Sequence, residues 1–278
     1  MQFNNLPIKV CCVIAACLMF TSSVYAQKSS DITEGVKAPA TVKVDGKLTE
    51  WGTTLPAYNK SNALHYILAN DANNLYLAIN STDQNTINKI LGGGLTLTIN
   101  KEGKKKEKDA TAITYPMVSG GGGRGFRMGG GRSRNGETVD TAALVTSRKQ
   151  TVAGMKEFSV TGVKEITDTL VSIYNTYGIK TAITFDAKGN LSYELAVPLK
   201  LLELNAGQPT ELAYNIKLNG LERGGGGRRE GGNRQGGGNG GGFGGGNGGG
   251  ISISGGEGGI MDLMMPTDFW GKYKLAKP

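Results

Sequence analysis

Ten short runs of apolar and β-branched residues recur along this chain, each five to eight residues long. Runs of this length, several with alternating apolar and polar residues, predict β-strands. Clusters of Asp, Asn and Gly separate some of them, as at 71–74 and 186–190, and such residues favour tight turns. The sequence therefore predicts a mainly β protein, a single two-sheet, jelly-roll-like β-sandwich. The predicted strands cover residues 40–44, 64–69, 75–80, 95–100, 111–118, 156–163, 181–186, 191–198, 211–218 and 271–275.

The first of these runs belongs to the segment T-V-K-V-D-G-K-L-T-E-W at 41–51. Its order predicts a strand, then a tight turn at Asp45-Gly46, then an aromatic residue, Trp51, that folds back onto the strand.

Short helices are also predicted, at 83–91 and near 199–204. Two segments, 137–149 and 165–177, fit either a helix or a strand. In the second of them the apolar spacing favours a helix, while the many β-branched residues oppose it.

Glycine is concentrated in two long tracts. Residues 119–136 hold 9 of the 45 glycines, and residues 220–259 hold 23. Such tracts bury few side chains and lose much backbone entropy on ordering, so both are predicted to be disordered loop insertions. The first carries four Arg and no acidic residue between 119 and 135, which would attract anionic polysaccharide or another cell-envelope polyanion.

The first 26 residues have the form of a secretory signal peptide, with Lys9, an apolar run at 10–20, and small residues Val24 and Ala26 before the predicted cleavage site. The apolar run is shorter than the roughly 20 residues that a membrane span needs, and no later segment is long or apolar enough. The alternative is a lipoprotein anchored through Cys17, because the I-A-A-C sequence that ends there resembles a lipobox.

All three cysteines lie within this signal, so the chain after cleavage has no disulfide and no thiol site. A secreted domain without disulfides needs a large core, and the length left after the signal and the glycine tracts suits one large sandwich. The predicted organisation is a signal peptide at 1–26, a flexible segment at 27–38, and one sandwich domain at 39–278 that contains both tracts.

Four short motifs span most of the chain after the signal. They are V-D-G-K-L at 44–48 with Glu50-Trp51, N-D-A-N-N-L-Y-L-A at 70–78, Y-E-L-A-V-P-L at 193–199, and D-F-W-G at 268–271. In this order they resemble the family 9 carbohydrate-binding modules and their DOMON-type relatives, which are common in secreted bacterial proteins. The resemblance implies a jelly-roll-like sandwich and sugar binding, and it implies no reaction.

A sugar site on a sandwich needs an aromatic face for the apolar side of the ring and polar groups for its hydroxyls. The candidate ligand-binding residues are Trp51, His65, Tyr66 and Trp270. Trp51 also fits a core anchor. The strand at 64–69 alternates, so His65 and Tyr66 point to opposite faces, and the sequence does not say which face is exposed.

Metal and catalytic sites have weaker candidates. His65 is the only histidine, so it has no cysteine or second histidine with which to bind zinc. Asp71 and Asn73 offer the oxygen ligands that calcium prefers, although the same residues are typical of tight turns. No pair of carboxylates is placed for glycoside hydrolysis, so the sequence predicts a protein that is not an enzyme and that has no cofactor beyond this candidate calcium.

The leading prediction is an exported, non-catalytic protein that binds carbohydrate or another small ligand through the sandwich. The alternative is a structural or interaction protein of the cell envelope, whose Gly/Arg-rich loops contact anionic surfaces or partner proteins. The R-G-F-R sequence at 124–127 resembles RNA-binding segments, but export argues against a nucleic-acid partner. The formal net charge of +8 falls by one when Lys9 leaves with the signal, and a charge of that size identifies no partner.

Overall fold

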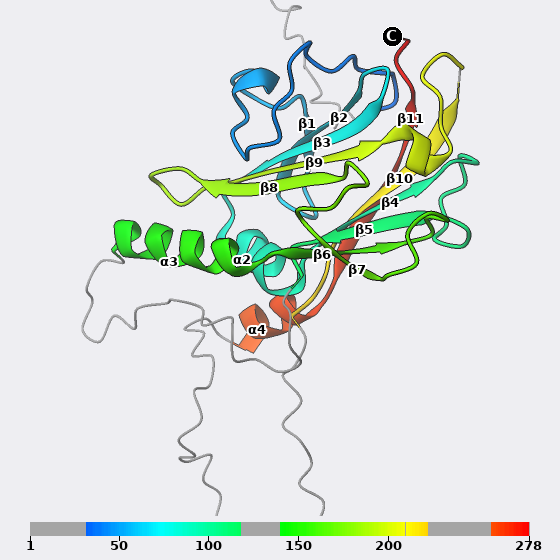
Figure 1. The fold of residues 1–278 in the computed structure, drawn as a ribbon. Coiled ribbons are helices and arrows are strands. Elements are labelled where there is room, and N and C mark those ends of the chain that lie inside the picture. The colour runs from blue at the N-terminus through cyan, green and yellow to red at the C-terminus, as the bar shows by residue number, and fades with distance from the viewer. Residues whose placement is uncertain (1–31, 118–139, 209, 222–256, 278) are drawn as a thin grey trace, which may run out of the picture.

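The computed structural model describes residues 32–117, 140–208, 210–221 and 257–277. These residues form two antiparallel sheets that pack against each other, as Figure 1 shows, so the predicted mainly β sandwich is confirmed. Sheet A contains, in spatial order, β1 (Ala57–Asn59), β2 (Leu64–Asn70), β3 (Asn74–Ser81), β9 (Leu191–Pro198) and β8 (Lys180–Phe185). Sheet B contains β11 (Thr267–Lys274), β10 (Glu211–Leu218), β4 (Leu95–Asn100), β5 (Thr111–Tyr115), β6 (Glu157–Thr161) and β7 (Leu170–Ser172).

Both sheets combine strands from distant parts of the sequence. In sheet A, β3 pairs with β9 from Asn74↔Pro198 to Ser81↔Leu191. In sheet B, β4 pairs with β10, and the hydroxyl of Tyr66 in sheet A lies 3.1 Å from that of Tyr214 in sheet B. Strands on either side of the first glycine tract therefore share one interior.

Three α-helices and two short 3-10 helices complete the described elements: η1 (Thr49–Trp51), α2 (Gln84–Gly93), α3 (Thr141–Gly154), η2 (Leu199–Leu202) and α4 (Glu257–Met264). The helix predicted at 83–91 is α2. The Asp83 side chain caps it by accepting from the Thr86 N–H at 2.8 Å, and the helix ends at Gly94 with φ 81°. In the ambiguous segment 137–149, residues 141–149 belong to α3, which Asp140 caps, and residues 137–139 lie outside the described residues.

Some predicted elements are wrong. Residues 40–44 form no strand, and Val42 and Val44 instead pack against the core next to the turn that Glu194 holds on sheet A. The segment 165–177 forms no helix and contributes only the short edge strand β7. Neither the three-residue β1 nor α4 was predicted, because both are too short to show a clear period.

The chain is well fixed from residue 32 onward, within the part predicted as a flexible segment. The Ala38 N–H donates to the Asn70 carbonyl at 2.9 Å, the Asn70 N–H donates to the Val36 carbonyl at 3.0 Å, and Ile32 is buried. The predicted signal peptide, the first glycine tract and most of the second lie outside the described residues. Of the helices that are described, none is both long and apolar enough to cross a membrane.

Asn70 joins the two ends of the described chain, and its loss should be costly. Its side chain is buried, and Oδ1 accepts from the Tyr273 hydroxyl at 2.9 Å and from the Ala276 N–H at 2.8 Å. We expect Asn70→Ala to lower the free energy of unfolding by about 2 to 3 kcal/mol, because it leaves buried donors without an acceptor. Urea denaturation measures this. The control Asn73→Ala, at an exposed side chain, should change stability by less than about 0.5 kcal/mol, and equal effects of the two variants would contradict the role of Asn70.

Candidate functional site

The outer face of sheet A carries a row of polar and aromatic side chains that crosses all five strands. Tyr66 points inward to sheet B, so His65, the preceding residue in β2, points outward. Residues directly opposite in neighbouring strands share a face, and the register therefore extends the row from His65 in both directions. This outer row consists of Tyr58, His65, Asn80, Ser192 and Thr184.

The outer row is long and partly open to solvent. Thr184 at one end bonds to the Gly46 carbonyl, so the open part of the row runs from Tyr58 to Ser192, over four strands spaced about 4.8 Å apart and a length of roughly 14 Å. Tyr58 is 43% exposed, and the four other side chains are half-buried. Because each side chain is held by a strand, the row is a flat and largely preformed surface.

An aromatic pair occupies one end of the outer row. The rings of Tyr58 and His65 lie with centroids 4.6 Å apart and an angle of 39° between their planes. At the next position, Asn80 donates through Nδ2 to the carbonyl of Leu191 at 3.1 Å, which fixes the orientation of its amide. The row thus places an aromatic surface beside an oriented polar group.

The segment before β1 covers the part of this face next to the outer row. Figure 1 shows it, in blue, lying beside β2 and β3. Trp51 is only 8% exposed, and its ring packs against Tyr76 of β3 with centroids 5.9 Å apart. Trp51 therefore has the position of a core anchor in this structure, one of its two interpretations from sequence.

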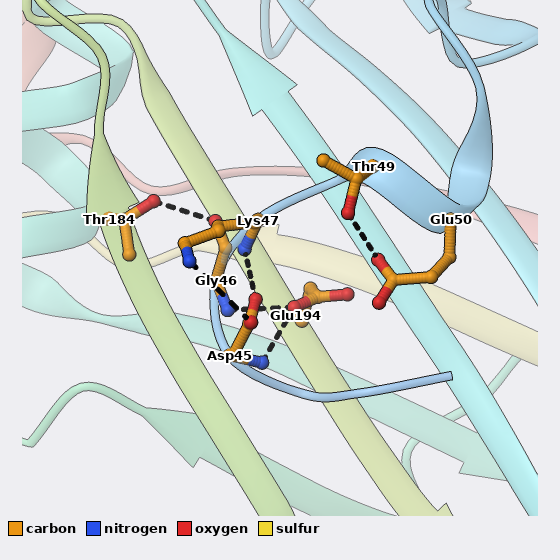
Figure 2. A network of polar contacts seen from close by, with 7 residues as sticks. All are labelled: Asp45, Gly46, Lys47, Thr49, Glu50, Thr184 and Glu194. Atoms are coloured by element: carbon orange, nitrogen blue, oxygen red, sulfur yellow. Dashed lines mark hydrogen bonds and ion pairs between the residues drawn. The ribbon is translucent and has the colours of Figure 1, made fainter. Parts of the chain in front are cut away.

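A single buried carboxylate holds this segment on the sheet. Glu194 of β9 points outward, and its Oε2 accepts from the N–H groups of Asp45 and Gly46 at 3.0 and 2.7 Å. Its Oε1 accepts from Trp51 Nε1 at 2.9 Å. Figure 2 shows the turn lying over β8 and β9, where the Thr184 hydroxyl donates to the Gly46 carbonyl at 2.6 Å.

The contact between this turn and sheet A requires a glycine at position 46. Its φ of 82° lies in the left-handed region, and a Cβ there would lie 2.6 Å from Cγ2 of Thr184. Glu50 lies close to Glu194 in the same view, and accepts from the Thr49 hydroxyl at 3.0 Å.

The pKa of Glu194 is raised, and several groups act on it. Burial is the largest cause and favours the protonated acid. Hydrogen bonds from Trp51, Gly46 and Asp45 oppose burial, while the nearby Glu50 carboxylate adds to the upward shift.

The structure separates the four candidate ligand residues. His65 lies on the outer row of sheet A, whereas Tyr66 is 1% exposed and lies between the sheets. Trp270 is half-buried on β11 and points away from the core, because the preceding residue, Phe269, packs inward against Tyr66. Trp270 therefore lies on the outer face of sheet B, and His65 and Trp270 belong to opposite surfaces.

Asp71 and Asn73, the candidate calcium ligands, form a turn. Asp71 Oδ1 accepts from the N–H groups of Asn73 and Asn74, each at 2.7 Å, and Oδ2 accepts from the Tyr76 hydroxyl at 2.7 Å. Burial acts to raise the pKa of Asp71, but these hydrogen bonds together lower it. Burial and the bond to Asp71 raise the pKa of Tyr76 to about 12. In the described part of the chain no group of three His, Cys, Asp or Glu side chains is arranged to hold a metal ion.

A charged hollow of about 330 Å³ opens at one end of the sandwich. Its floor includes Ile99 and Leu201, and its rim carries Lys101 and Lys164, which both form ion pairs with Glu203. The two lysines lower the pKa of Glu203 to about 2. The charges of the two lysines and of Glu203 are therefore largely paired with one another, and the cluster forms an ion-pair network beside the hollow.

A scan of protein-family models gives no match to this chain, and a search of curated proteins finds no significant relative. The resemblance to family 9 carbohydrate-binding modules therefore stays a prediction. Its first and third motifs do meet in space, because Glu194 binds Asp45, Gly46 and Trp51.

Of the five members of the outer row, sequence reasoning named only His65 and missed Tyr58, Asn80, Ser192 and Thr184. Tyr58 lies in a strand of only three residues, which shows no alternation. Asn80 ends a run that was predicted as a strand, and it could have been found by pairing that run with the one at 64–69 in an antiparallel hairpin.

Replacing Glu194 tests the anchor. Glu194→Gln puts an NH₂ group against N–H donors, so we expect it to lower the free energy of unfolding by about 1 to 3 kcal/mol at pH 7. Trp51→Phe should have an effect of similar size, since it removes one of the three donors. Chemical denaturation measures both. The exposed Glu165→Gln serves as the control, and an anchor variant as stable as this control would contradict the role of Glu194.

The stability difference between the wild-type chain and Glu194→Gln should depend on pH. The folded chain binds the Glu194 proton more tightly than the unfolded chain does, so ionisation of Glu194 costs stability. The advantage of the wild type should be fully present below the ordinary glutamate pKa of 4.5 and should decline as the pH rises through the raised value. Denaturation of both chains from pH 4 to 8 measures the difference. An advantage that grows with pH would show that the folded-state pKa is lowered instead.

Proposed function

We propose that this chain is an exported, non-catalytic binding protein that binds carbohydrate along the outer row of sheet A. The observation that carries the proposal is the aromatic pair of Tyr58 and His65 at the end of a half-buried polar row. An aromatic face takes the apolar side of a sugar ring, and neighbouring side chains bind its hydroxyls.

The polar members of the row suit hydroxyl groups. Ser192 can donate and accept, and Asn80 keeps its Oδ1 as an acceptor while Nδ2 bonds to Leu191. The open part of the row, roughly 14 Å long, is longer than one sugar ring, so an oligosaccharide is favoured over a single sugar.

The residues of the outer row suit ligand binding and lack what glycoside hydrolysis requires. Glycoside hydrolysis needs two carboxylates across a cleft, roughly 5 to 10 Å apart, and none of the five row residues is acidic. Because the side chains are fixed by the strands and by the anchored segment next to them, little ordering is required when a ligand binds.

Export is supported by residues 1–26, which have the charged, apolar and small-residue regions of a signal peptide. Expression of the full sequence followed by N-terminal sequencing of the exported chain tests this. A first residue of Gln27 supports export as a free protein, and a lipid attached to Cys17 would favour the anchored alternative.

Truncation of the aromatic pair tests the proposed site. We expect Tyr58→Ala and His65→Ala each to weaken binding of the exported chain to a responsive polysaccharide by about tenfold, a loss of about 1.4 kcal/mol. Affinity gel electrophoresis over a panel of polysaccharides measures this, and Trp270→Ala on the opposite sheet is the matched aromatic control. Clean negatives across the panel, or binding that depends on Trp270 alone, would overturn the proposal.

A further inference from the structure

Lys89 of α2 is a buried lysine at one end of the sandwich. Lys89 is 4% exposed, yet its ammonium makes no hydrogen bond to any residue in the described ranges. The closest carboxylate oxygen, from Asp262 of α4, lies 3.8 Å away, which is beyond hydrogen-bonding distance. The ammonium therefore has donors left for oxygen acceptors that enter the space beside it.

Lys89 borders a small and strongly polar hollow of about 150 Å³ between α2, α4 and the turn from β1 to β2. Only Ala63 and Leu218 are apolar among its lining residues. Its polar lining includes Ser61, Asp83, Asn85, Lys89, Asp262 and Thr267.

A second group in this hollow is also incompletely bonded. Thr267 Oγ1 is buried and has no partner within the part of the chain that the structure describes. Asp83 uses Oδ1 to cap α2, and among the described residues its other oxygen has no hydrogen-bond donor that would compete with a ligand. Free donors and free acceptors therefore line the same small space.

The charges of the lining decide which ligand fits. A small anion would meet the Asp83 and Asp262 carboxylates, and a metal cation would meet the Lys89 ammonium. An apolar molecule would leave the polar groups unpaired. A neutral hydroxyl group suits all of them, because it accepts from an ammonium and donates to a carboxylate.

We propose that this hollow binds adjacent hydroxyl groups of a small polyol or of the edge of a sugar ring. Its volume equals about five water molecules at ~30 Å³ each, which is room for a diol-bearing fragment. In this arrangement Lys89 and Thr267 donate to the ligand oxygens, and Asp83 and Asp262 accept from them. The proposal rests on the hollow and not on the outer row, so either can fail alone.

Amide chemical-shift titration of the exported chain with glycerol, glucose and sodium sulfate tests the proposal. We expect saturable shifts at Asn85, Lys89 and Asp262 with glycerol or glucose, and none with sulfate. A response to glycerol identifies a free polyol as sufficient, and a response to glucose alone identifies the sugar edge. Absence of shifts with both, or a response to sulfate only, would overturn the proposal.

Variants separate this site from the outer row. Lys89→Met keeps the buried stem and should weaken binding at least tenfold, whereas Lys60→Met, at an exposed residue of the same turn region, should not. If Lys89→Met fails to fold, Asp262→Asn provides the same comparison from an exposed position. Tyr58→Ala should leave the hollow's response intact. Binding that persists in both Lys89→Met and Asp262→Asn would contradict the assignment.

Discussion

The carboxylate of Glu194 determines which part of the outer face of sheet A is accessible. A charged side chain on a central strand is costly to bury unless donors surround it, and here two backbone N–H groups and the Trp51 indole supply three hydrogen bonds. These bonds bring residues 45–51 onto the sheet, where they exclude water from one part of the face. The part that stays open is the outer row from Tyr58 to Ser192. One carboxylate therefore sets the boundary between buried structure and accessible surface.

The inward and outward side chains of each strand in sheet A have different surroundings. Inward residues such as Tyr66 and Tyr193 fill the space between the sheets, and the Tyr66–Tyr214 contact joins the two sheets directly. The outward residues form two groups. Ala78 and Glu194 lie under the anchored segment, whereas His65 and Asn80 are partly exposed to solvent. The candidate surface therefore depends on a loop segment as much as on the strands. Weakening the anchor would expose a wider and less ordered face.

Sequence alone predicted the architecture well because alternation and turn residues are local signals. The strands that contain Leu77, Ile99 and Leu195 lie where their patterns predict. The candidate site was harder to predict from sequence, because the exposure of a side chain depends on which distant residues cover it. The local sequence around Trp51 does not show whether its ring is buried. Its burial depends on the bond to Glu194, 143 positions away, and on packing against Tyr76. The same long-range contact holds the chain next to residues 40–44, the predicted strand that does not form, where Val42 and Val44 pack against the core without joining either sheet.

The β1–β2 hairpin connects the outer row with the hollow near α2. Tyr58 and His65 lie on its two strands, and Ser61 and Ala63 of its turn line the hollow. Ala63 has a φ of 47°, which an alanine adopts only where the surrounding structure holds it, and its carbonyl accepts from Ser81 Oγ at 3.1 Å. The hairpin is thus fixed at its turn by tertiary contacts. A rigid turn keeps the aromatic pair and the polar hollow at a constant separation, so a ligand long enough to reach both would meet the two proposed sites in a fixed arrangement.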